Sequence, residues 1–342
     1  MAERRPTLAD VAARAGVSTA LVSIVVREAP GASAQTRARV LAVAEELGYR
    51  PDVRARLLRR RRSRLLGVVF DVQHAFHGDL VGGLYAAAGS VGYELALSAV
   101  TPGRDEDQAV ASLLQDRCEA LVLLGPQASA ARLTALRLPV VVVARAVRSA
   151  TSGSGPPDVV RSDDARGSAM AVDHLAGLGH RRVAHVDGGR APGAAERRHG
   201  YAEALGRHGL GGSALVLPGG LREEDGATAA RALLDLPAGR RPTAVTVFND
   251  RCATGVLDVL RTAGVAVPGA MSVVGFDDDR LAGLAHVNLT TVAQDAAALT
   301  ELAVTRAVAR LDGVPVDVHE QVVVPHLVVR GTTAPPPERS DA

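Results

Sequence analysis

The chain has 342 residues but no lysine, no tryptophan and only two cysteines. Cys118 and Cys252 lie far apart, each beside an apolar stretch, which predicts two reduced core thiols rather than a disulfide framework. No uninterrupted apolar run approaches the roughly 20 residues of a bilayer-spanning helix, and the N-terminus lacks the apolar core of a signal peptide. We therefore expect a cytoplasmic protein with no membrane segment.

Motifs of the common enzyme classes are missing as well. The residues after the first apolar stretch, Phe70 to Gly78, contain no glycine-rich phosphate loop, and no serine or cysteine lies in a recognisable nucleophile elbow. His174, His180 and His185 are separated by six and five residues, which does not match the common zinc spacings. The sequence thus predicts no enzyme, no metal site and no cofactor.

Positive charge is concentrated at the start of the chain. The first 64 residues hold 14 arginines and 6 carboxylates, whereas the whole chain has a net charge of +2, so the remainder is mildly acidic. Clustered cations bind phosphates favourably because binding releases counterions, and such a segment is typical of a nucleic-acid-binding protein. The alternative is a solvated basic tail.

Three short helices are predicted in residues 1–50. A capping box at Thr7 begins the first helix, and Gly16 ends it. Ser18 and Ser33 are the predicted N-caps of the second and third helices. The residues predicted to face inward on these two helices are Val22, Val25, Val26, Val40, Leu41, Ala44 and Leu47. Two short helices joined through a glycine turn form a helix-turn-helix unit.

Residues 51–64 are predicted to form an arginine-rich hinge. Seven arginines fall within eleven positions from Arg54, and like charges at helical spacing oppose helix formation in free solution. We expect this segment to fold against phosphates, with the ordering cost taken from the binding free energy. A flexible basic linker is the alternative.

The body, residues 65–333, is predicted to belong to the α/β class. Six valine-rich runs alternate with helical patterns, namely Leu65–Phe70, Ala120–Leu124, Pro139–Val143, Arg182–Val186, Thr243–Val247 and Ser272–Phe276. Strands buried on both faces indicate doubly wound parallel sheets, and six strands over this length suit two units better than one. Beyond the carboxyl ends of these strands, where ligands collect, lie Asp71, Asn249, Asp250 and the run from Asp277 to Asp279. These residues indicate a polar cleft, and helix N-capping is the alternative role for each.

The two lobes of the body are predicted to be discontinuous in sequence, because we expect the chain to cross between them three times. Lobe one should comprise about residues 65–162 and 292–322, and lobe two about residues 163–290 and 323–333. The proline-rich end, residues 334–342, is predicted to be disordered. No leucine heptad follows the last strand, which favours a twofold dimer over a tetramer held by a helical bundle.

One pattern runs without a gap through Thr7-Leu-Ala-Asp-Val-Ala-Ala-Arg-Ala-Gly-Val-Ser18, Val22-Ser23, Thr36-Arg37, Val40 and Gly48-Tyr-Arg-Pro51. It resembles the DNA-binding head of the lactose/galactose repressor (LacI/GalR) family. The resemblance implies that the second helix enters the major groove of double-stranded DNA, where base edges carry the sequence information. The implied base-reading positions are Thr19, Ala20 and Ile24, and the other implied DNA contacts are Thr7, Ser18, Ser23, Ser33, Thr36 and Tyr49.

The predicted reading helix departs from the family pattern. The usual Thr-Val-Ser-Arg is Leu-Val-Ser-Ile at residues 21–24, so the arginine able to contact guanine through two hydrogen bonds is missing. Thr19, Ala20 and Ile24 can contact thymine methyl groups, and Arg27, where the family usually has asparagine, can add a base or phosphate contact. We therefore expect an operator unlike the family consensus.

In the resembled family the hinge is a helix that pairs across a dimer and wedges a leucine into the minor groove. Pro51, Ala55 and Leu58 match this pattern, which implies that Leu58 is the wedge. Ala55 and Arg56 are further implied DNA contacts. Asp52 departs from the pattern, since a carboxylate repels phosphate.

Motifs of the body, among them Asp173-His-Leu-Ala-Gly-Leu-Gly-His180, Phe248-Asn-Asp250 and Leu289-Thr-Thr-Val-Ala-Gln-Asp295, look like the effector domain of the same family. That domain is similar to periplasmic sugar-binding proteins. The implied effector contacts are Asp71, Arg197, Asn249, Asp277 and Gln294, and Phe76 is a candidate apolar face for a sugar ring. Carboxylates, amides and an arginine fork suit paired hydroxyls. No aromatic counterpart of the family's second stacking position lies near residues 222–225, which argues against a planar purine.

Together these features predict a homodimeric, ligand-responsive transcriptional repressor that binds a near-palindromic DNA operator and a sugar or sugar derivative. Both an inducer, which favours the DNA-free state, and a corepressor fit the sequence. The competing interpretations are a solute-binding protein and a sugar kinase or dehydrogenase. The basic head argues against the first, and the missing phosphate and catalytic motifs argue against the second.

Overall fold

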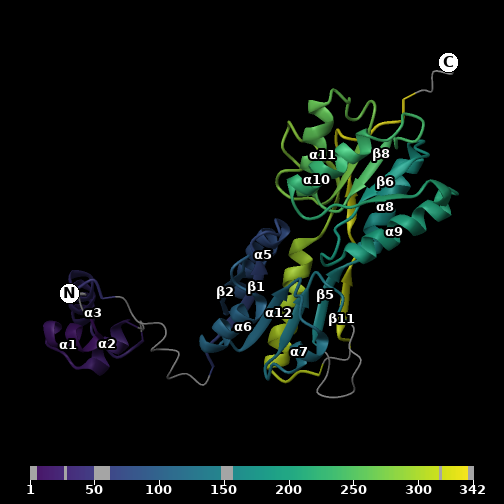
Figure 1. The fold of residues 1–342 in the computed structure, drawn as a ribbon. Helices are drawn as coiled ribbons and strands as arrows, with labels where there is room; N and C mark the ends of the chain where they lie inside the picture. Colours follow the sequence, from purple (N-terminus) through teal and green to yellow (C-terminus); the bar gives the residue numbers. More distant parts are fainter. Residues whose placement is uncertain (1–5, 27–28, 50–61, 148–156, 316–317, 338–342) are drawn as a thin grey trace. The chain divides into compact units, whose positions relative to one another are not determined.

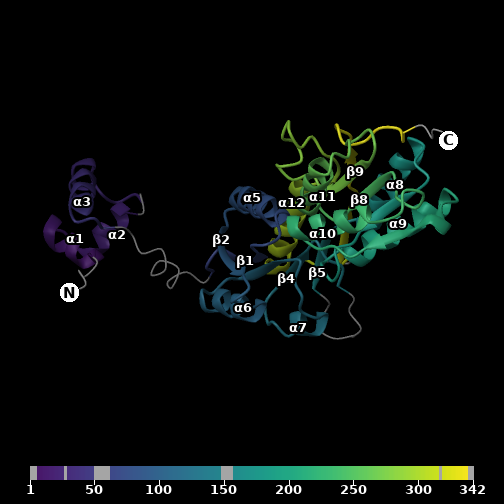
Figure 2. The ribbon, with the colours of Figure 1, turned by 45° about the horizontal axis from the view of Figure 1, so that its top comes forward.

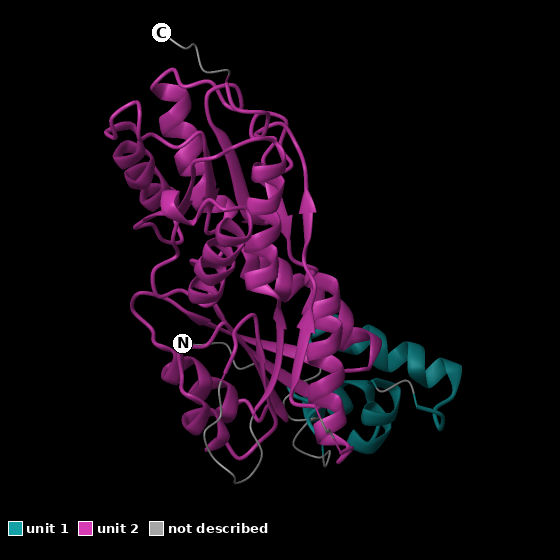
Figure 3. Cartoon of the chain, turned by 90° about the vertical axis from the view of Figure 1, so that its right-hand side faces the viewer, with its two compact units in different colours: residues 1–63 teal, residues 64–342 magenta. Residues whose placement is uncertain are grey.

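The computed structural model describes residues 6–26, 29–49, 62–147, 157–315 and 318–337. The chain divides into two compact units, residues 1–63 and residues 64–342, which Figure 3 shows in different colours. The helical part of the first unit is hereafter the head, and the second unit is the body.

The head consists of three helices, α1 (Leu8–Ala15), α2 (Thr19–Val26) and α3 (Ala34–Glu46). The predicted capping box is present, because the Thr7 hydroxyl accepts the amide N–H of Asp10 and the Asp10 carboxylate accepts that of Thr7. Gly16 has a left-handed conformation with φ 67°, which ends α1 and turns the chain toward α2. Local sequence signals therefore set the helix boundaries.

A miniature core joins the three helices. Val11, Val22 and Val40 come from one helix each and are fully buried. The prediction that Leu41 faces inward is wrong, because its side chain is 49% exposed. Neighbouring residues on a helix point about 100° apart, and the buried face of α3 continues from Val40 to Val43 instead.

The first sheet of the body has six parallel strands in the order β11-β5-β4-β3-β1-β2. Their bounds are β1 (Leu65–Asp71), β2 (Glu94–Val100), β3 (Ala120–Leu124), β4 (Val140–Val143), β5 (Asp158–Ser162) and β11 (Glu320–Val323). Figure 2 shows helices on both faces of this sheet. One face is covered by α5 (Phe76–Ser90) and α12 (Ala296–Leu311), and the other by α6 (Glu106–Gln115) and α7 (Ala130–Thr134). This layer is lobe one.

The second sheet has the order β12-β10-β9-β8-β6-β7 and is parallel except for β12, which is antiparallel to β10. Its strands are β6 (Val183–Val186), β7 (Leu215–Leu217), β8 (Ala244–Val247), β9 (Ser272–Asp277), β10 (Thr290–Ala293) and β12 (His326–Val328). One face is covered by α8 (Asp164–Gly177) and α9 (Ala194–Arg207), and the other by α10 (Glu223–Leu234) and α11 (Asp250–Thr262). A short 3-10 turn, Gly211–Ser213, precedes β7. This layer is lobe two.

The predicted α/β class is confirmed, and the six predicted runs are β1, β3, β4, β6, β8 and β9. The predicted runs do not include β2, β5, β7, β10, β11 and β12, and two of these strands, β2 and β7, were missed for a visible reason. β2 lies at a sheet edge and buries only Ser98 fully, so it is not a continuous apolar run, and β7 has only three residues. Apolar runs thus identify central strands better than edge strands.

The chain crosses between the lobes at three places that lie close together. β5 leads into α8, β10 leads into α12, and β11 leads into β12. The Ser162 hydroxyl donates to Gln294 Oε1 at 2.6 Å, and the Asp163 N–H donates to the Val323 carbonyl at 2.9 Å. Because β10 belongs to lobe two, this crossing follows residue 293, slightly later than the predicted boundary at residue 292. Figure 1 shows α12, the helix after that crossing, returned to the side of α5.

The structure bears on two further sequence predictions, the state of the two cysteines and the order of the C-terminal segment. Cys118 and Cys252 are buried and free, as expected. Ala334, the first residue of the predicted disordered tail, is instead anchored, because its carbonyl accepts hydrogen bonds from His180 at 2.9 Å and from Ser272 at 3.1 Å. Within the described ranges, no single helix has the length and apolar content of a membrane span, and α1 and α2 meet that test only as a pair bent by 106°.

Candidate functional site

Helix α2 presents the predicted base-reading residues. Thr19 and Ala20 in its first turn are exposed, and Ile24 one turn later is half-buried. The eight residues of α2 include no charged side chain, so the helix offers DNA only aliphatic and hydroxyl groups. Arg27, the predicted additional contact, lies outside the described residues.

The hydroxyl residues of the head lie mainly at helix starts. Ser18 Oγ accepts the N–H of Leu21, and Ser33 Oγ accepts that of Thr36, each at 3.2 Å. These caps fix the N-termini of α2 and α3, and helix N-termini attract phosphate through their free N–H groups. The other predicted contacts in the described head are Thr7, Ser23 and Tyr49. Ala55, Arg56 and Leu58 of the hinge lie outside the described residues.

Arg37 on α3 forms hydrogen bonds to the end of α2 and to the loop after it. Its guanidinium donates to the carbonyl of Val25 at 3.3 Å and to that of Ala29 at 2.9 Å. An ion pair between Arg14 and Glu46, 2.6 Å long, also links α1 to α3. These contacts link α3 to each of the two helices before it.

Arg197, on α9, is the centre of a buried polar network in the body. Its Nε donates to Asp164 Oδ1 at 2.8 Å, and its Nη1 donates to the Phe248 carbonyl at 2.5 Å and lies 3.6 Å from Asp277 Oδ1. The guanidinium carbon is 3.5 Å from the ring centre of Phe276 and 4.5 Å from that of Phe248. Carboxylates and aromatic faces therefore compensate a cation that is only 4% exposed.

Asp277 and Gln294 extend this network to lobe one. Asp277 ends β9 with φ 112°, and its Oδ1 accepts Gln294 Nε2 at 2.7 Å. Gln294 in turn accepts the hydroxyl of Ser162, the last residue of β5. Burial raises the pKa of Asp277 to about 7, although Arg197 and the hydrogen bond from Gln294 act in the opposite direction. The network thus spans a point where the chain crosses between the lobes.

Asn249 and Asp250 have structural partners at the same edge of the second sheet. Asn249 Oδ1 accepts the N–H of Cys252 at 2.8 Å, which makes it the N-cap of α11. Asp250 accepts the N–H of Asp279 at 2.9 Å and the hydroxyl of Thr291 at 2.6 Å. The capping role that the sequence left open for Asn249 is therefore present.

Asp71 lies at the carboxyl end of β1, and the loop that follows it contacts lobe two. Asp71 Oδ1 accepts the N–H of Gln73 at 2.8 Å. The Gln73 side-chain oxygen accepts Arg222 Nη2, and its backbone carbonyl accepts Arg251 Nη1 at 3.2 Å. Arg251 also contacts both carboxylate oxygens of Glu223 at 2.8 Å. This loop brings the carboxyl edges of the two sheets into direct contact.

Phe76 lies in the core of lobe one rather than on the surface of the cleft. It begins α5, is 2% exposed and packs in one cluster with Val68 and Leu80. The expectation that its ring offers an open face to a sugar does not hold in this arrangement, because the helix turns the ring toward the sheet. His74 and His77 lie on either side of it in sequence, and their rings stack with centres 4.3 Å apart. Burial lowers the pKa of both, to about 4 for His77.

Of the six predicted effector contacts, the structure joins Arg197, Asp277 and Gln294 in one network and places Asn249 and Asp71 on the facing sheet edges. Ser162, Gln73 and Asp164 complete the site but were not predicted. Asp164 was overlooked because the strand before it, β5, was itself overlooked. Once β5 is recognised, the rule that ligands collect beyond strand ends selects Ser162 and Asp164 at once.

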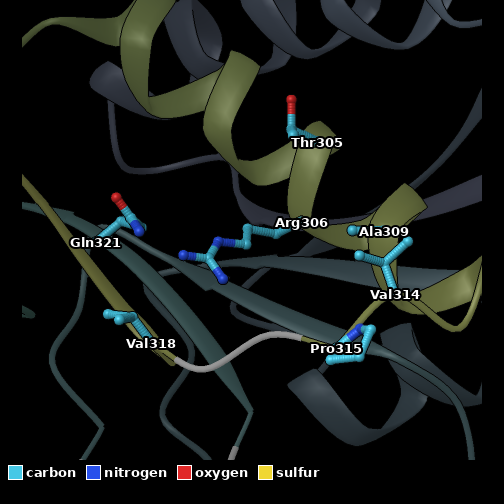
Figure 4. Close-up of a pocket in the computed structure, with 7 residues that line it drawn as sticks. All are labelled: Thr305, Arg306, Ala309, Val314, Pro315, Val318 and Gln321. Carbon is cyan, nitrogen blue, oxygen red and sulfur yellow. The ribbon is translucent and has the colours of Figure 1, made fainter.

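Within the described part of the chain, no group of three or more His, Cys, Asp or Glu side chains is arranged to hold a metal ion. A shallow groove lies elsewhere on lobe one, between α12 and β11 (Figure 4). It is lined by Thr305, Arg306, Ala309, Val314, Pro315, Val318 and Gln321. None of the predicted effector contacts lines this groove.

Comparison with known proteins places this architecture in a family. Residues 7–52 match the model of bacterial regulatory proteins of the lacI family, and residues 172–333 match that of a periplasmic binding protein-like domain. The transcriptional regulator GalR of Escherichia coli is 32% identical over 96% of each chain. The structure of a LacI transcriptional regulator from a Rhodococcus species is 50% identical and covers 80% of this chain and 100% of its own, with a TM-score of 0.75.

A second solved structure extends the likeness to the head. The Lac repressor dimer bound to operator and the anti-inducer ONPF is 28% identical, covers 97% of this chain and 100% of its own, and has a TM-score of 0.79. These relatives are regulators rather than enzymes, in agreement with the prediction from the missing catalytic motifs. The resemblance stated from the sequence is confirmed: the chain belongs to the lacI family of bacterial regulatory proteins.

Proposed function

We propose that this protein is a transcriptional repressor whose affinity for operator DNA is controlled by a small molecule bound between lobe one and lobe two. The observation that carries the proposal is the position of the Arg197 network. It joins Asp277 and Gln294 of lobe two to Ser162 of lobe one beside a crossing of the chain. A ligand that contacts this network changes the free energy of one lobe arrangement relative to another, which is what effector control requires.

The proposed DNA contacts are the predicted set of the head and hinge. Thr19, Ala20 and Ile24 read bases, the hydroxyl residues at helix starts bind phosphates, and Leu58 acts as the minor-groove wedge. Residues 1–50 form the reading head and residues 51–64 the hinge in this proposal. Because α2 has no charged residue, we expect base reading through methyl groups and an operator unlike the family consensus.

We propose a homodimer that binds a near-palindromic operator in the cytoplasm. The Lac repressor, which has the same architecture, is described as a dimer bound to operator. A twofold dimer presents two heads to two half-sites one helical turn apart or at multiples of it. The proposed effector contacts are Asp71, Arg197, Asn249, Asp277 and Gln294, and their carboxylate, amide and guanidinium groups suit the hydroxyls of a sugar.

Two measurements on the full-length chain test the proposal. Selection from random duplex DNA should return a near-palindrome, and binding to it should weaken linearly with salt on a log–log plot. A thermal-shift panel of sugars should contain at least one that raises the melting temperature. Recovery of the usual family half-site would overturn the account of α2, and DNA binding without any salt dependence would overturn the proposed DNA-binding function.

A further inference from the structure

Gln73, in the loop after β1, is bound by two arginines of lobe two. Its side-chain oxygen accepts a hydrogen bond from Arg222 Nη2, and its backbone carbonyl accepts one from Arg251 Nη1 at 3.2 Å. Arg251 also donates to both carboxylate oxygens of Glu223 at 2.8 Å, which restricts the orientation of its guanidinium. Gln73, Arg222 and Arg251 are hereafter the clasp.

The clasp lies away from the places where the chain crosses between the lobes. In the first sheet, β4 and β3 separate β1 from β5, and three strand spacings amount to roughly 14 Å. In the second sheet, Arg222 follows β7, the edge strand opposite β12. A rotation of the lobes about the crossings therefore separates the clasp residues more than it separates Ser162 from Gln294.

One proposed effector contact orients the lobe-one half of the clasp. Asp71 Oδ1 accepts the N–H of Gln73 at 2.8 Å, a local hydrogen bond that bends the loop after β1. The N–H of Asp71 donates to His77 Nδ1 at 3.0 Å, so the first turn of α5 also holds this loop. A ligand that binds the Asp71 carboxylate therefore contacts the group that orients Gln73.

A second proposed effector contact orients the lobe-two half. Asn249 Nδ2 donates at 3.2 Å to the carbonyl of Leu221, the residue directly before Arg222. Asn249 Oδ1 caps α11, the helix that carries Arg251. One amide side chain thus positions the backbone beside both arginines. Each half of the clasp is therefore tied by hydrogen bonds to a residue proposed to contact the effector.

We propose that the clasp regulates the effector site by stabilising the arrangement in which the two lobes close on the ligand. This proposal rests on the proposed function of the cleft as the effector site and deepens it. The clasp forms only where the edges of the lobes meet, and a ligand that contacts both Asp71 and Asn249 requires the same approach of the edges. Each therefore stabilises the other. Gln73 is a positioning residue in this account, because it acts on the lobes rather than on the effector.

Two opposite substitutions of Gln73 test the proposal on the full-length protein, with the sugar that most raises its melting temperature as the probe. Gln73→Ala removes the hydrogen bond to Arg222 and should weaken binding of the sugar by about fivefold. Gln73→Glu places a carboxylate beside Arg222 and should strengthen it by about threefold, with a smaller gain at high salt. Calorimetry gives the dissociation constants, and the urea midpoint of unfolding should stay unchanged in both variants.

Operator affinity provides a readout that needs no ligand. Gln73→Glu should shift the operator affinity of the ligand-free protein in the direction in which the sugar shifts it, and Gln73→Ala in the opposite direction. Gln115→Ala and Gln115→Glu are the matched controls, because Gln115 is exposed at the end of α6 in the same lobe. They make the same changes of side chain and charge, and they should alter neither affinity.

The failure of the clasp and the failure of the proposed effector function give different results. Gln73 variants that shift either affinity in the same direction, or by no more than the Gln115 controls, overturn the clasp and leave the sugar effector in place. If no sugar changes the melting temperature or the operator affinity of the unchanged protein, the proposed effector function fails instead. The ligand-free operator affinities then still decide the clasp, since opposite shifts support it and equal shifts overturn it.

Discussion

The head and the body carry their chemistry in opposite ways. The predicted reading helix of the head, α2, exposes Thr19 and Ala20, has no charged side chain and consists of eight consecutive residues. The Arg197 network of the body is buried and charged, and its members come from segments between Ser162 and Gln294. We infer from this difference that the proposed base-reading residues can change one at a time, whereas each residue of the proposed effector site is also the partner of another.

The largest expected effect is the loss of the head alone, with the body left folded. Val22→Asp places a carboxylate in the fully buried core of the head, and an unpaired buried charge costs more than a small three-helix core can offset. We expect the head to unfold and operator affinity to fall at least about a hundredfold, while the melting temperature of the body stays unchanged. DNA-binding titration and calorimetry measure the two results.

Leu41→Asp is the control for that variant, because the Leu41 side chain is half exposed on α3. It should leave the head folded and change stability by no more than about 0.5 kcal/mol. If Leu41→Asp were as damaging as Val22→Asp, the buried face assigned to α3 would be wrong.

The second effect lies in the body. Arg197→Met leaves Asp164 and Asp277 without their buried cation, and breaking such a network costs about 3–5 kcal/mol. Urea unfolding of the body should report this loss, and the response to effector should disappear. Arg198→Met, which removes a partly exposed cation one residue further on, should cost no more than about 1 kcal/mol.

The sequence predicted the helices of the head better than the contacts of the proposed effector site. The reason is physical. Capping boxes and helix phase are local, so the starts of α1, α2 and α3 were predictable, and only the rotation of α3 at Leu41 was misjudged. In the body, Asp164 and Ser162 become neighbours of Arg197 and Gln294 through strand order and chain crossings. Such contacts depend on β5, a short strand with charged residues at its start and near its end, which resembles no continuous apolar run.

Phe76 illustrates the same limit. Its place after a strand end suggested a position facing the cleft, but α5 begins at Phe76 and the helix directs the ring into the core of lobe one. Which way a side chain points at a strand-to-helix junction depends on where the helix starts. A helix that starts one residue earlier or later turns each of its side chains by about 100°.

The third effect is a pH dependence that belongs to the body alone. The pKa of Asp277 is raised from its ordinary value to about 7, so its contribution to stability is present in acid and is lost as the pH rises toward and through 7. Asp277→Asn should therefore lose less stability than the unchanged protein between pH 5.5 and pH 8. Thermal unfolding of both proteins across that range gives the difference, which includes the effect of Asp277 on the pKa of its neighbour Asp250.

Asp258→Asn serves as the reference for the pH series, because this exposed carboxylate on α11 forms no ion pair within the described part of the chain. Its stability should follow the pH profile of the unchanged protein. A profile for Asp277→Asn that also coincides with that of the unchanged protein would show that Asp277 titrates at its ordinary value.

The smallest effect concerns base reading in the head. Ile24→Arg restores the arginine that the family pattern has at this position, and one arginine–guanine contact through two hydrogen bonds gives about 1–3 kcal/mol of discrimination. The variant should gain affinity for half-sites with guanine at one position, as measured by selection from random DNA. Leu41→Arg adds the same charge on α3 and should strengthen binding to all sequences alike without changing the selected half-site.

The central claim is that effector binding at the buried network of the body and DNA binding by α2 of the head are coupled. The most direct test is the affinity of the full-length protein for its selected operator, measured with and without a saturating concentration of the sugar that most raises its melting temperature. The account predicts a change of about 5- to 150-fold, and operator DNA should change the affinity for the sugar by the same factor. An operator affinity that is identical with and without the bound sugar would contradict it.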